Sequence, residues 1–203
     1  MTMAIAGDDL KETPSQTAGP YVHVGLAPGA AGFKMYDQEL GQDIAGPNAD
    51  GARIRVVGRV LDGDGAAVKD VMIELWQANA HGRYAHPAGG GAVEPGFRGW
   101  GRVTPDFETG QWAFDTVKPG AVDGQAPHIS FWLVARGINI GLHTRMYFND
   151  DVMAHAADPV LASLAPASRR STLIASRTEP EGGLVYRFDI RLQGDDETVF
   201  FDV

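Results

Sequence analysis

The sequence contains no cysteine, which excludes disulfides and thiolate metal ligands and is typical of a cytoplasmic protein. It also lacks any apolar run near the ~20 residues that a membrane-spanning helix needs, and Asp8 and Asp9 follow the first residues too closely for a signal peptide. Basic residues are few, because 17 Lys and Arg stand against 26 Asp and Glu, giving a formal net charge of −9. Since phosphate binding needs clustered basic side chains, we expect neither a nucleic-acid partner nor a membrane partner.

Long stretches with helical periodicity are scarce, and short segments that alternate between apolar and polar residues take their place. In 184–192, every second residue is apolar, which is typical of a half-buried strand. The pattern predicts an all-β fold, an antiparallel β-sandwich of about eight strands with short helices near 159–176, where Pro159 and Pro166 suit first helical turns. The expected strands are 52–61, 69–77, 99–104, 111–116, 127–135, 142–148, 184–192 and 197–202.

The first fifty residues differ from the rest. Thr13–Tyr21 carries two prolines and a glycine, which neither a helix nor a central strand accommodates well. The sequence therefore predicts an extended N-terminal arm that leads into a loop. Several aromatic residues in expected loops need cover, either from a partner chain or from within the chain itself; they are Phe33, Tyr36, Phe97 and Trp100.

One expected strand contains His128 and Ser130, which lie two residues apart and therefore point to the same face. Two histidines at this spacing could hold one metal ion, whereas the neutral hydroxyl of a serine is a poor ligand beside imidazole. Tyr84, in a loop after the strand that ends at Gln77, is the other credible ligand. Because a usable iron or zinc site needs at least three protein ligands, these two are too few, and the residues favour a buried histidine bonded to a carbonyl and a tyrosine that packs its ring over a metal site.

Two arginines are candidates for charge recognition. Arg136 ends a strand and precedes Gly137, so it is either a bidentate partner for a substrate carboxylate or an ordinary surface arginine. Arg145 lies in an expected strand among apolar neighbours, which favours a structural ion pair. The sequence holds no phosphate-binding glycine loop, nucleophile elbow or zinc-binding helix motif.

Several segments taken together resemble the intradiol ring-cleaving dioxygenases, from about residue 12 to the end. The resemblance implies a mainly antiparallel β-sandwich and a mononuclear non-haem Fe(III) held by two tyrosines and two histidines. Enzymes of this family use O₂ to cleave a catechol ring between its two hydroxyl-bearing carbons. The segments that carry the resemblance are 13–21, 76–84, 117–120, 126–129, 135–140 and 186–190.

Matched residue by residue, the resemblance accounts for only half of the iron ligands. Tyr84 matches the first tyrosine and His128 matches the first histidine. Val122 stands where the second tyrosine is expected, and Ser130 replaces the second histidine. We therefore expect these four residues to mark a vestigial site, with no metal, cofactor or catalytic residue in this chain alone.

The resemblance is closest to the alpha subunit of a two-chain member. It implies a homologous beta subunit that binds Fe(III), higher assemblies of alpha–beta protomers, and a small aromatic acid and O₂ as substrates. Residues 1–50 would form the arm and loop that contact this partner, and 51–203 the dioxygenase-like β-sandwich. The residues that match the lining of the partner's substrate pocket are Thr17, Gly19, Pro20, Tyr21 and Arg136.

Two other functions are compatible with the residues. The first is a self-sufficient intradiol catechol dioxygenase that binds metal through Tyr84, His128 and some of the remaining loop and strand histidines, namely His81, His86 and His143. The second is a non-enzymatic β-sandwich binding module with no enzyme partner.

Overall fold

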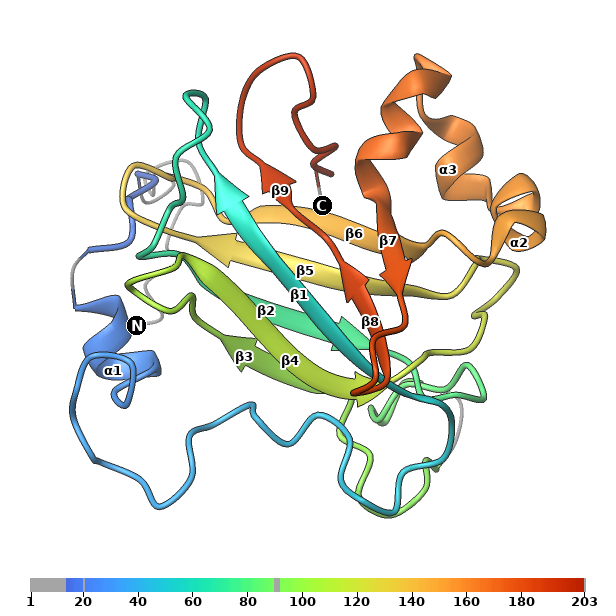
Figure 1. Cartoon of the computed structure of the whole chain (residues 1–203), viewed down its shortest axis with the longest axis horizontal. Helices are drawn as coiled ribbons and strands as arrows, with labels where there is room; N and C mark the ends of the chain where they lie inside the picture. Colours follow the sequence, from blue (N-terminus) through green and yellow to red (C-terminus); the bar gives the residue numbers. More distant parts are fainter. Residues whose placement is uncertain (1–13, 20, 90–91, 203) are drawn as a thin grey trace, which may run out of the picture.

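The computed structural model describes residues 14–19, 21–89 and 92–202, and this part of the chain forms a nine-stranded sheet (Figure 1). Strands of the sheet follow the order β3-β2-β5-β6-β7-β8-β1-β4, with β9 paired to β1. Their bounds are β1 Arg53–Leu61, β2 Met72–Gln77, β3 Trp100–Val103, β4 Gln111–Val117, β5 His128–Val134, β6 Leu142–Phe148, β7 Ile174–Thr178, β8 Leu184–Arg187 and β9 Ile190–Arg191.

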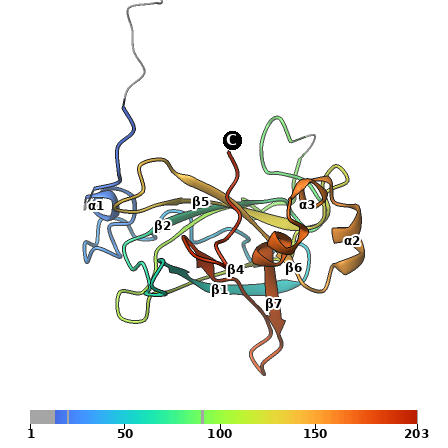
Figure 2. The same ribbon diagram turned by 90° about the horizontal axis from the view of Figure 1, so that it is seen from above.

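The all-β prediction is confirmed, and most neighbouring strands pair antiparallel as expected. Three pairings are parallel, however, because β1 pairs with β8 and β9, and β6 pairs with β7. Seen from above, the sheet folds back on itself so that β2 and β5 lie over β1 (Figure 2). No helix in the described ranges is long and apolar enough to cross a membrane.

The core lies between these two layers and is rich in aromatic side chains. The ring of Phe131, from β5, lies 5.7 Å from that of Trp112 on β4 and 5.6 Å from that of Phe188. Gly58, in β1, lies against the same cluster, since a Cβ at this position would come within 1.9 Å of the Phe188 carbonyl oxygen. Close packing of this kind leaves no room for even one added methyl group.

The expected strand 184–192 is divided into β8 and β9. The carboxylate of Asp189 accepts a hydrogen bond from the backbone nitrogen of Arg59 at 3.0 Å, so a side chain replaces the backbone acceptor and interrupts the ladder. The strand expected at 197–202 was also wrong, because in the described residues it is reduced to a single bridge between His143 and Phe201.

The helical region expected at 159–176 is only partly correct. It contains helix α3 (Pro159–Ser163) and the 3₁₀ helix η1 (Ala167–Leu173), but its last residues belong to β7. Pro159 occupies a first-turn position of α3, as expected, and the Asp158 side chain caps that helix. The sequence patterns did not indicate the two other helices, α1 (Val22–Leu26) and α2 (Val152–Ala157).

Candidate functional site

Two of the four positions matched to metal ligands lie in contact. His128 begins β5, and Tyr84 lies in the loop that follows β2. The Tyr84 hydroxyl oxygen is 3.4 Å from Nε2 of His128, and the Tyr84 ring stacks on Trp76 with 6.3 Å between ring centroids. The structure therefore brings together the two retained positions across 44 residues of sequence.

The protonation of this pair follows from its surroundings. Nδ1 of His128 lies 2.8 Å from the carbonyl oxygen of Ala126, which can only accept, so Nδ1 carries the proton and Nε2 accepts. Burial lowers the pKa of His128, which keeps the ring neutral. Burial likewise raises the pKa of Tyr84, so a neutral phenol donates a long hydrogen bond to a neutral imidazole.

The two replaced positions offer no ligand atoms of comparable strength. Val122 lies in a turn in which it is hydrogen bonded in both directions to Gln125, at 3.2 and 2.8 Å. Ser130 is half-buried in β5, where its backbone is paired with Trp76 on one side and Arg145 on the other. An aliphatic side chain and a neutral hydroxyl do not complete an Fe(III) site. Within the described ranges no three His, Asp or Glu side chains gather as a metal site would require.

The histidines of the alternative metal site make other contacts. His81 is exposed and lies 3.3 Å from an Asp50 carboxylate oxygen. His86 packs edge-on against Trp76 and accepts a hydrogen bond from the backbone of Ala88. His143 is paired in β6 with Trp132.

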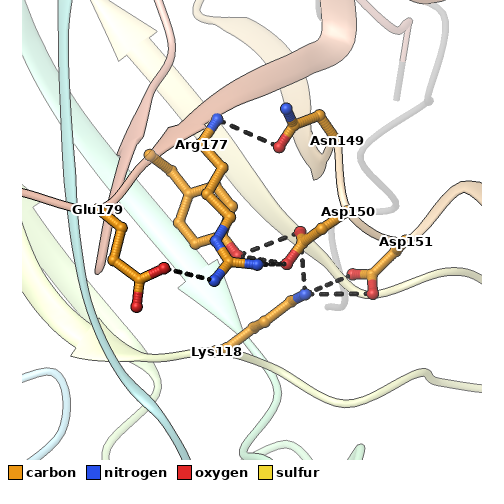
Figure 3. Close-up of polar contacts among 7 residues, drawn as sticks. Lys118, Asn149, Asp150, Asp151, Arg177 and Glu179 are labelled. Atoms are coloured by element: carbon orange, nitrogen blue, oxygen red, sulfur yellow. Dashed lines mark hydrogen bonds and ion pairs between the residues drawn. The ribbon is translucent and has the colours of Figure 1, made fainter. Parts of the chain in front are cut away.

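A charged network anchors the turn that leads to Val122 (Figure 3). Lys118 Nζ lies 3.1 Å from an Asp150 oxygen and 3.0 Å from an Asp151 oxygen, directly after β6. Asp150 also accepts a hydrogen bond from the buried Tyr186 hydroxyl at 2.9 Å, and Arg177 lies 3.3 Å away. The network thus ties the turn after β4 to β6, β7 and β8.

Close backbone contacts hold the Tyr84 loop against this turn. A Cβ at Gly82 would lie 2.0 Å from the Ala121 carbonyl oxygen, and one at Gly120 would lie 2.5 Å from the Ala80 carbonyl oxygen. Gly82 also has φ +74°, a conformation that favours glycine. The Gly-Arg-Tyr and Lys-Pro-Gly segments are therefore packed backbone to backbone, which fixes the loop that carries Tyr84.

The matched pocket-lining residues form a second group, around the N-terminal arm. The Thr17 hydroxyl accepts a hydrogen bond from the Gly137 nitrogen at 2.7 Å and donates one to the Ala135 carbonyl at 3.2 Å. It therefore brackets Arg136, whose side chain is 66% exposed and ion-paired through Nε with Asp70. The structure thus brings Thr17 next to Arg136.

The other members of this group are less constrained. Tyr21 precedes α1 and is 80% exposed. A Cβ at Gly19 would meet nothing within 4 Å, so no contact inside this chain requires a glycine there. Pro20 lies outside the described residues.

The two groups lie at opposite ends of β5. His128 is the first residue of β5, and Arg136 lies just beyond its last residue, Val134. At a rise of ~3.3 Å per residue, the eight steps between them span roughly 25 Å. In Figure 1, β5 accordingly runs from the side of α2 to the side of α1.

Sequence reasoning missed Asp70, and it assigned Arg145 the wrong contact. Asp70 gave no signal, because its contact with Arg136 depends on how the loop before β2 meets the end of β5. The structural ion pair expected for Arg145 is not formed among the described residues. Its Nη1 instead donates a 2.6 Å hydrogen bond to Oε1 of Gln125, and its guanidinium lies over the Phe201 ring at 5.8 Å.

Residues 31–194 match the sequence model of a family described as "Dioxygenase". The chain is 50% identical over 198 residues to the protocatechuate 3,4-dioxygenase alpha chain of Pseudomonas putida, covering 95% of this chain and 97% of that one. Identity to the alpha chain of Burkholderia cepacia is 47%, covering 96% and 98%. The protocatechuate 3,4-dioxygenase beta chain of Burkholderia cepacia is 40% identical over 161 residues, covering 73% and 67%.

Solved structures show the same fold at lower identity. A dioxygenase domain from Streptomyces sp. SirexAA-E superposes with a TM-score of 0.57 at 21% identity, covering 93% of this chain and all of that domain. An intradiol ring-cleavage dioxygenase from Tetranychus urticae gives a TM-score of 0.57 at 15% identity, covering 90% and 94%. The chain belongs to the intradiol ring-cleaving dioxygenases, and its sequence is more similar to the two alpha chains than to the beta chain.

Proposed function

We propose that this chain is the non-iron-binding subunit of a protocatechuate 3,4-dioxygenase and completes the substrate pocket of a homologous beta subunit that binds Fe(III). The assembled enzyme would cleave protocatechuate with O₂ to 3-carboxy-cis,cis-muconate. The observation that carries the proposal is the separation of the arm and Arg136 from the vestigial pair Tyr84 and His128 at opposite ends of β5.

This separation decides which pocket Arg136 can serve. A catechol with its carboxylate is only about 7–8 Å long, built from bonds of ~1.5 Å, whereas roughly 25 Å of strand separates Arg136 from His128. One substrate molecule cannot reach both ends. Arg136 therefore contributes to chemistry only if another chain brings its metal to the arm.

The charge at the arm suits a carboxylated substrate. The chain carries a net charge of −9, so binding of an anion depends on a local cation. Asp70 engages Nε of Arg136, which leaves the two terminal nitrogens of the guanidinium to face a second carboxylate. Thr17 fixes the backbone on both sides of this arginine.

Exposed apolar side chains follow the arm in the sequence and support a partner interface in this segment. Large hydrophobic residues between 21 and 40 stand out from the surface, and such a concentration in one segment is typical of a protein interface. Phe33 and Tyr36, for which cover was expected, remain 52% and 44% exposed. The exposed members are Tyr21, Leu26, Phe33, Met35, Tyr36 and Leu40.

Two other aromatic residues do not need the partner. Phe97 is buried in this chain beside Ala49 and Val117. Trp100 lies in β3, where the Arg102 guanidinium covers its ring at 5.3 Å. Of the two kinds of cover expected for these aromatic residues, Phe97 and Trp100 therefore receive theirs from within the chain.

The proposal is tested by producing this chain together with a beta chain whose four metal-ligand positions are complete. We expect co-purification, one iron per alpha–beta protomer, and cleavage of protocatechuate. Arg136→Ala should lower kcat/KM for protocatechuate by about tenfold or more, because a charge-assisted hydrogen bond is lost, and should leave the iron content unchanged. Tyr21→Ala should act in the same direction.

Arg55→Ala is the matched control, since Arg55 forms a similarly exposed ion pair with Asp115 on β1 and β4, away from β5. It should leave kcat/KM unchanged. The proposal fails if this chain alone binds iron and cleaves catechols, or if it recruits no iron-bearing homologue. Loss of iron from the Arg136→Ala assembly would show that the role of Arg136 is misassigned.

A further inference from the structure

Arg145 faces the position at which a metal-ligating histidine is replaced. It lies directly opposite Ser130 in the antiparallel pairing of β5 and β6. Residues paired in this way share one face of the sheet, with Cβ atoms ~5 Å apart. Arg145 is thus the cross-strand neighbour of the smallest of the four vestigial positions.

The same side chain is tied to the turn that carries the other replaced position. Arg145 Nη1 donates a 2.6 Å hydrogen bond to Oε1 of Gln125. Gln125 is in turn bonded backbone to backbone with Val122, where the second tyrosine is expected. Arg145 is therefore linked to both positions at which ligands are missing.

The two retained positions also experience the Arg145 charge. At Tyr84, the nearby guanidinium opposes the effect of burial on the pKa of the phenol. At His128, it acts together with burial to lower the pKa of the ring. The Arg145 charge thus acts in the same direction on both members of the hydrogen-bonded pair, lowering the pKa of each.

We propose that the guanidinium of Arg145 takes the place of the metal ion in this chain, so that the vestigial site is a permanently charged, metal-free version of the family's site. An arginine does not lose its proton in proteins. A ferric ion entering beside it would meet a like charge in a partly buried setting, where repulsion is strong. Iron is therefore excluded by a resident cation in addition to the two missing ligands.

This inference rests on the match of Tyr84, Val122, His128 and Ser130 to metal-ligand positions and not on the subunit role proposed above. Its test accordingly needs no partner. The full chain is prepared with Val122→Tyr and Ser130→His, which restore the ligand set, and with either Arg145 or Arg145→Gln. Glutamine removes the charge and retains a donor for Gln125.

Each purified variant is incubated with ferric iron, desalted, and measured for iron per chain and for the visible band of tyrosinate bound to Fe(III). The double variant should stay colourless. The variant that also carries Arg145→Gln should develop the band and retain about tenfold more iron, since a like charge is removed from the site. Arg145→Met, also uncharged, should behave in the same way and serves as a second variant if the glutamine variant does not fold.

Arg145→Lys in the double variant separates charge from shape. Lysine retains the positive charge without the planar guanidinium, so this variant should stay iron-free. The proposal is overturned if the double variant takes up as much iron as the uncharged variants, if the lysine variant does so, or if both uncharged variants fold by circular dichroism and remain iron-free.

Discussion

Thr17 and Gly137 are hydrogen bonded at 2.7 Å although 120 residues separate them in the sequence. This contact holds the N-terminal arm against the end of β5, next to the only arginine among the residues matched to the pocket lining. The arm is thus positioned by the chain itself before any partner is present. Ordering of this kind reduces the entropy that a partner or substrate must overcome on binding.

Replacement of Thr17 by valine should loosen the arm. Two hydrogen bonds, one from Gly137 and one to Ala135, are removed while the side-chain volume is kept. Because one of these bonds is exposed and the other only partly buried, each is worth about 1 kcal/mol, and we expect a rise of about fivefold in KM for protocatechuate in the assembled enzyme, with iron content unchanged. Thr17→Ser retains the hydroxyl and should restore the KM; an unchanged KM in Thr17→Val would count against a role for the arm.

Asp70 positions Arg136, so Asp70→Asn should affect only substrates with a carboxylate. The Asp70 side chain is 25% exposed, whereas that of Arg136 is 66% exposed, and such a pair contributes little to stability. We expect the KM for protocatechuate to rise by several-fold while the KM for catechol, which has no carboxylate, stays the same. Steady-state kinetics of the assembled enzyme with both substrates measures this; equal effects on the two would indicate a general structural role.

Lowering the pH should weaken the network around Lys118, because Asp150 becomes protonated and loses its negative charge. Burial acts to raise the pKa of Asp150, but hydrogen bonds from Tyr186 and Lys118 outweigh it, and the pKa is lowered. A carboxylate with a depressed pKa stabilises the fold above its unfolded pKa of about 3.9, and this contribution is lost as the pH falls through the folded value.

Asp150→Asn should therefore lower the melting temperature at pH 7, and this difference from the wild type should disappear as the pH falls through the lowered pKa of Asp150. Asp115→Asn, in the exposed ion pair with Arg55, is the control and should change the melting temperature little at any pH. If Asp150→Asn lowers the melting temperature by the same amount in acid as at pH 7, the effect does not come from the carboxylate charge.

Gly58→Ala should destabilise the core between the two layers. The new Cβ would lie 1.9 Å from the Phe188 carbonyl oxygen and 2.5 Å from a Trp112 ring carbon, so β1 must shift relative to these neighbours at a cost of about 1–3 kcal/mol or more. Chemical denaturation of the purified chain measures this. Gly25→Ala is the matched control, because a Cβ there would meet nothing within 4 Å, and a similar loss in both variants would refute the packing argument.

Alternating patterns predicted the strands whose two faces differ, such as β1 and β4. They did not predict the break at Asp189, because it depends on a side chain bonding to another strand. They also missed β7 after η1, because five residues that complete a parallel pair with β6 carry too little local pattern. Register between strands is not encoded in either strand alone.

The same limit applies to the candidate site. Tyr84 and His128 were identified through their local motifs, and the structure brings them together. Asp70 has no motif, and the pairing of Arg145 with Ser130 is a matter of register between β5 and β6. Local motifs therefore identified Tyr84 and His128. The contacts of Asp70 and Arg145 depend on how distant segments pack together, and only the structure shows them.

The placement of the vestigial site and the arm at opposite ends of β5 makes them separable modules for protein engineering. A reaction centre rebuilt around Tyr84 and His128 would lie roughly 25 Å along the strand from Arg136, which we propose to line a neighbour's pocket. Substitutions at such a distance usually add independently. One protomer could then carry two different oxidation sites, each optimised without disturbing the other.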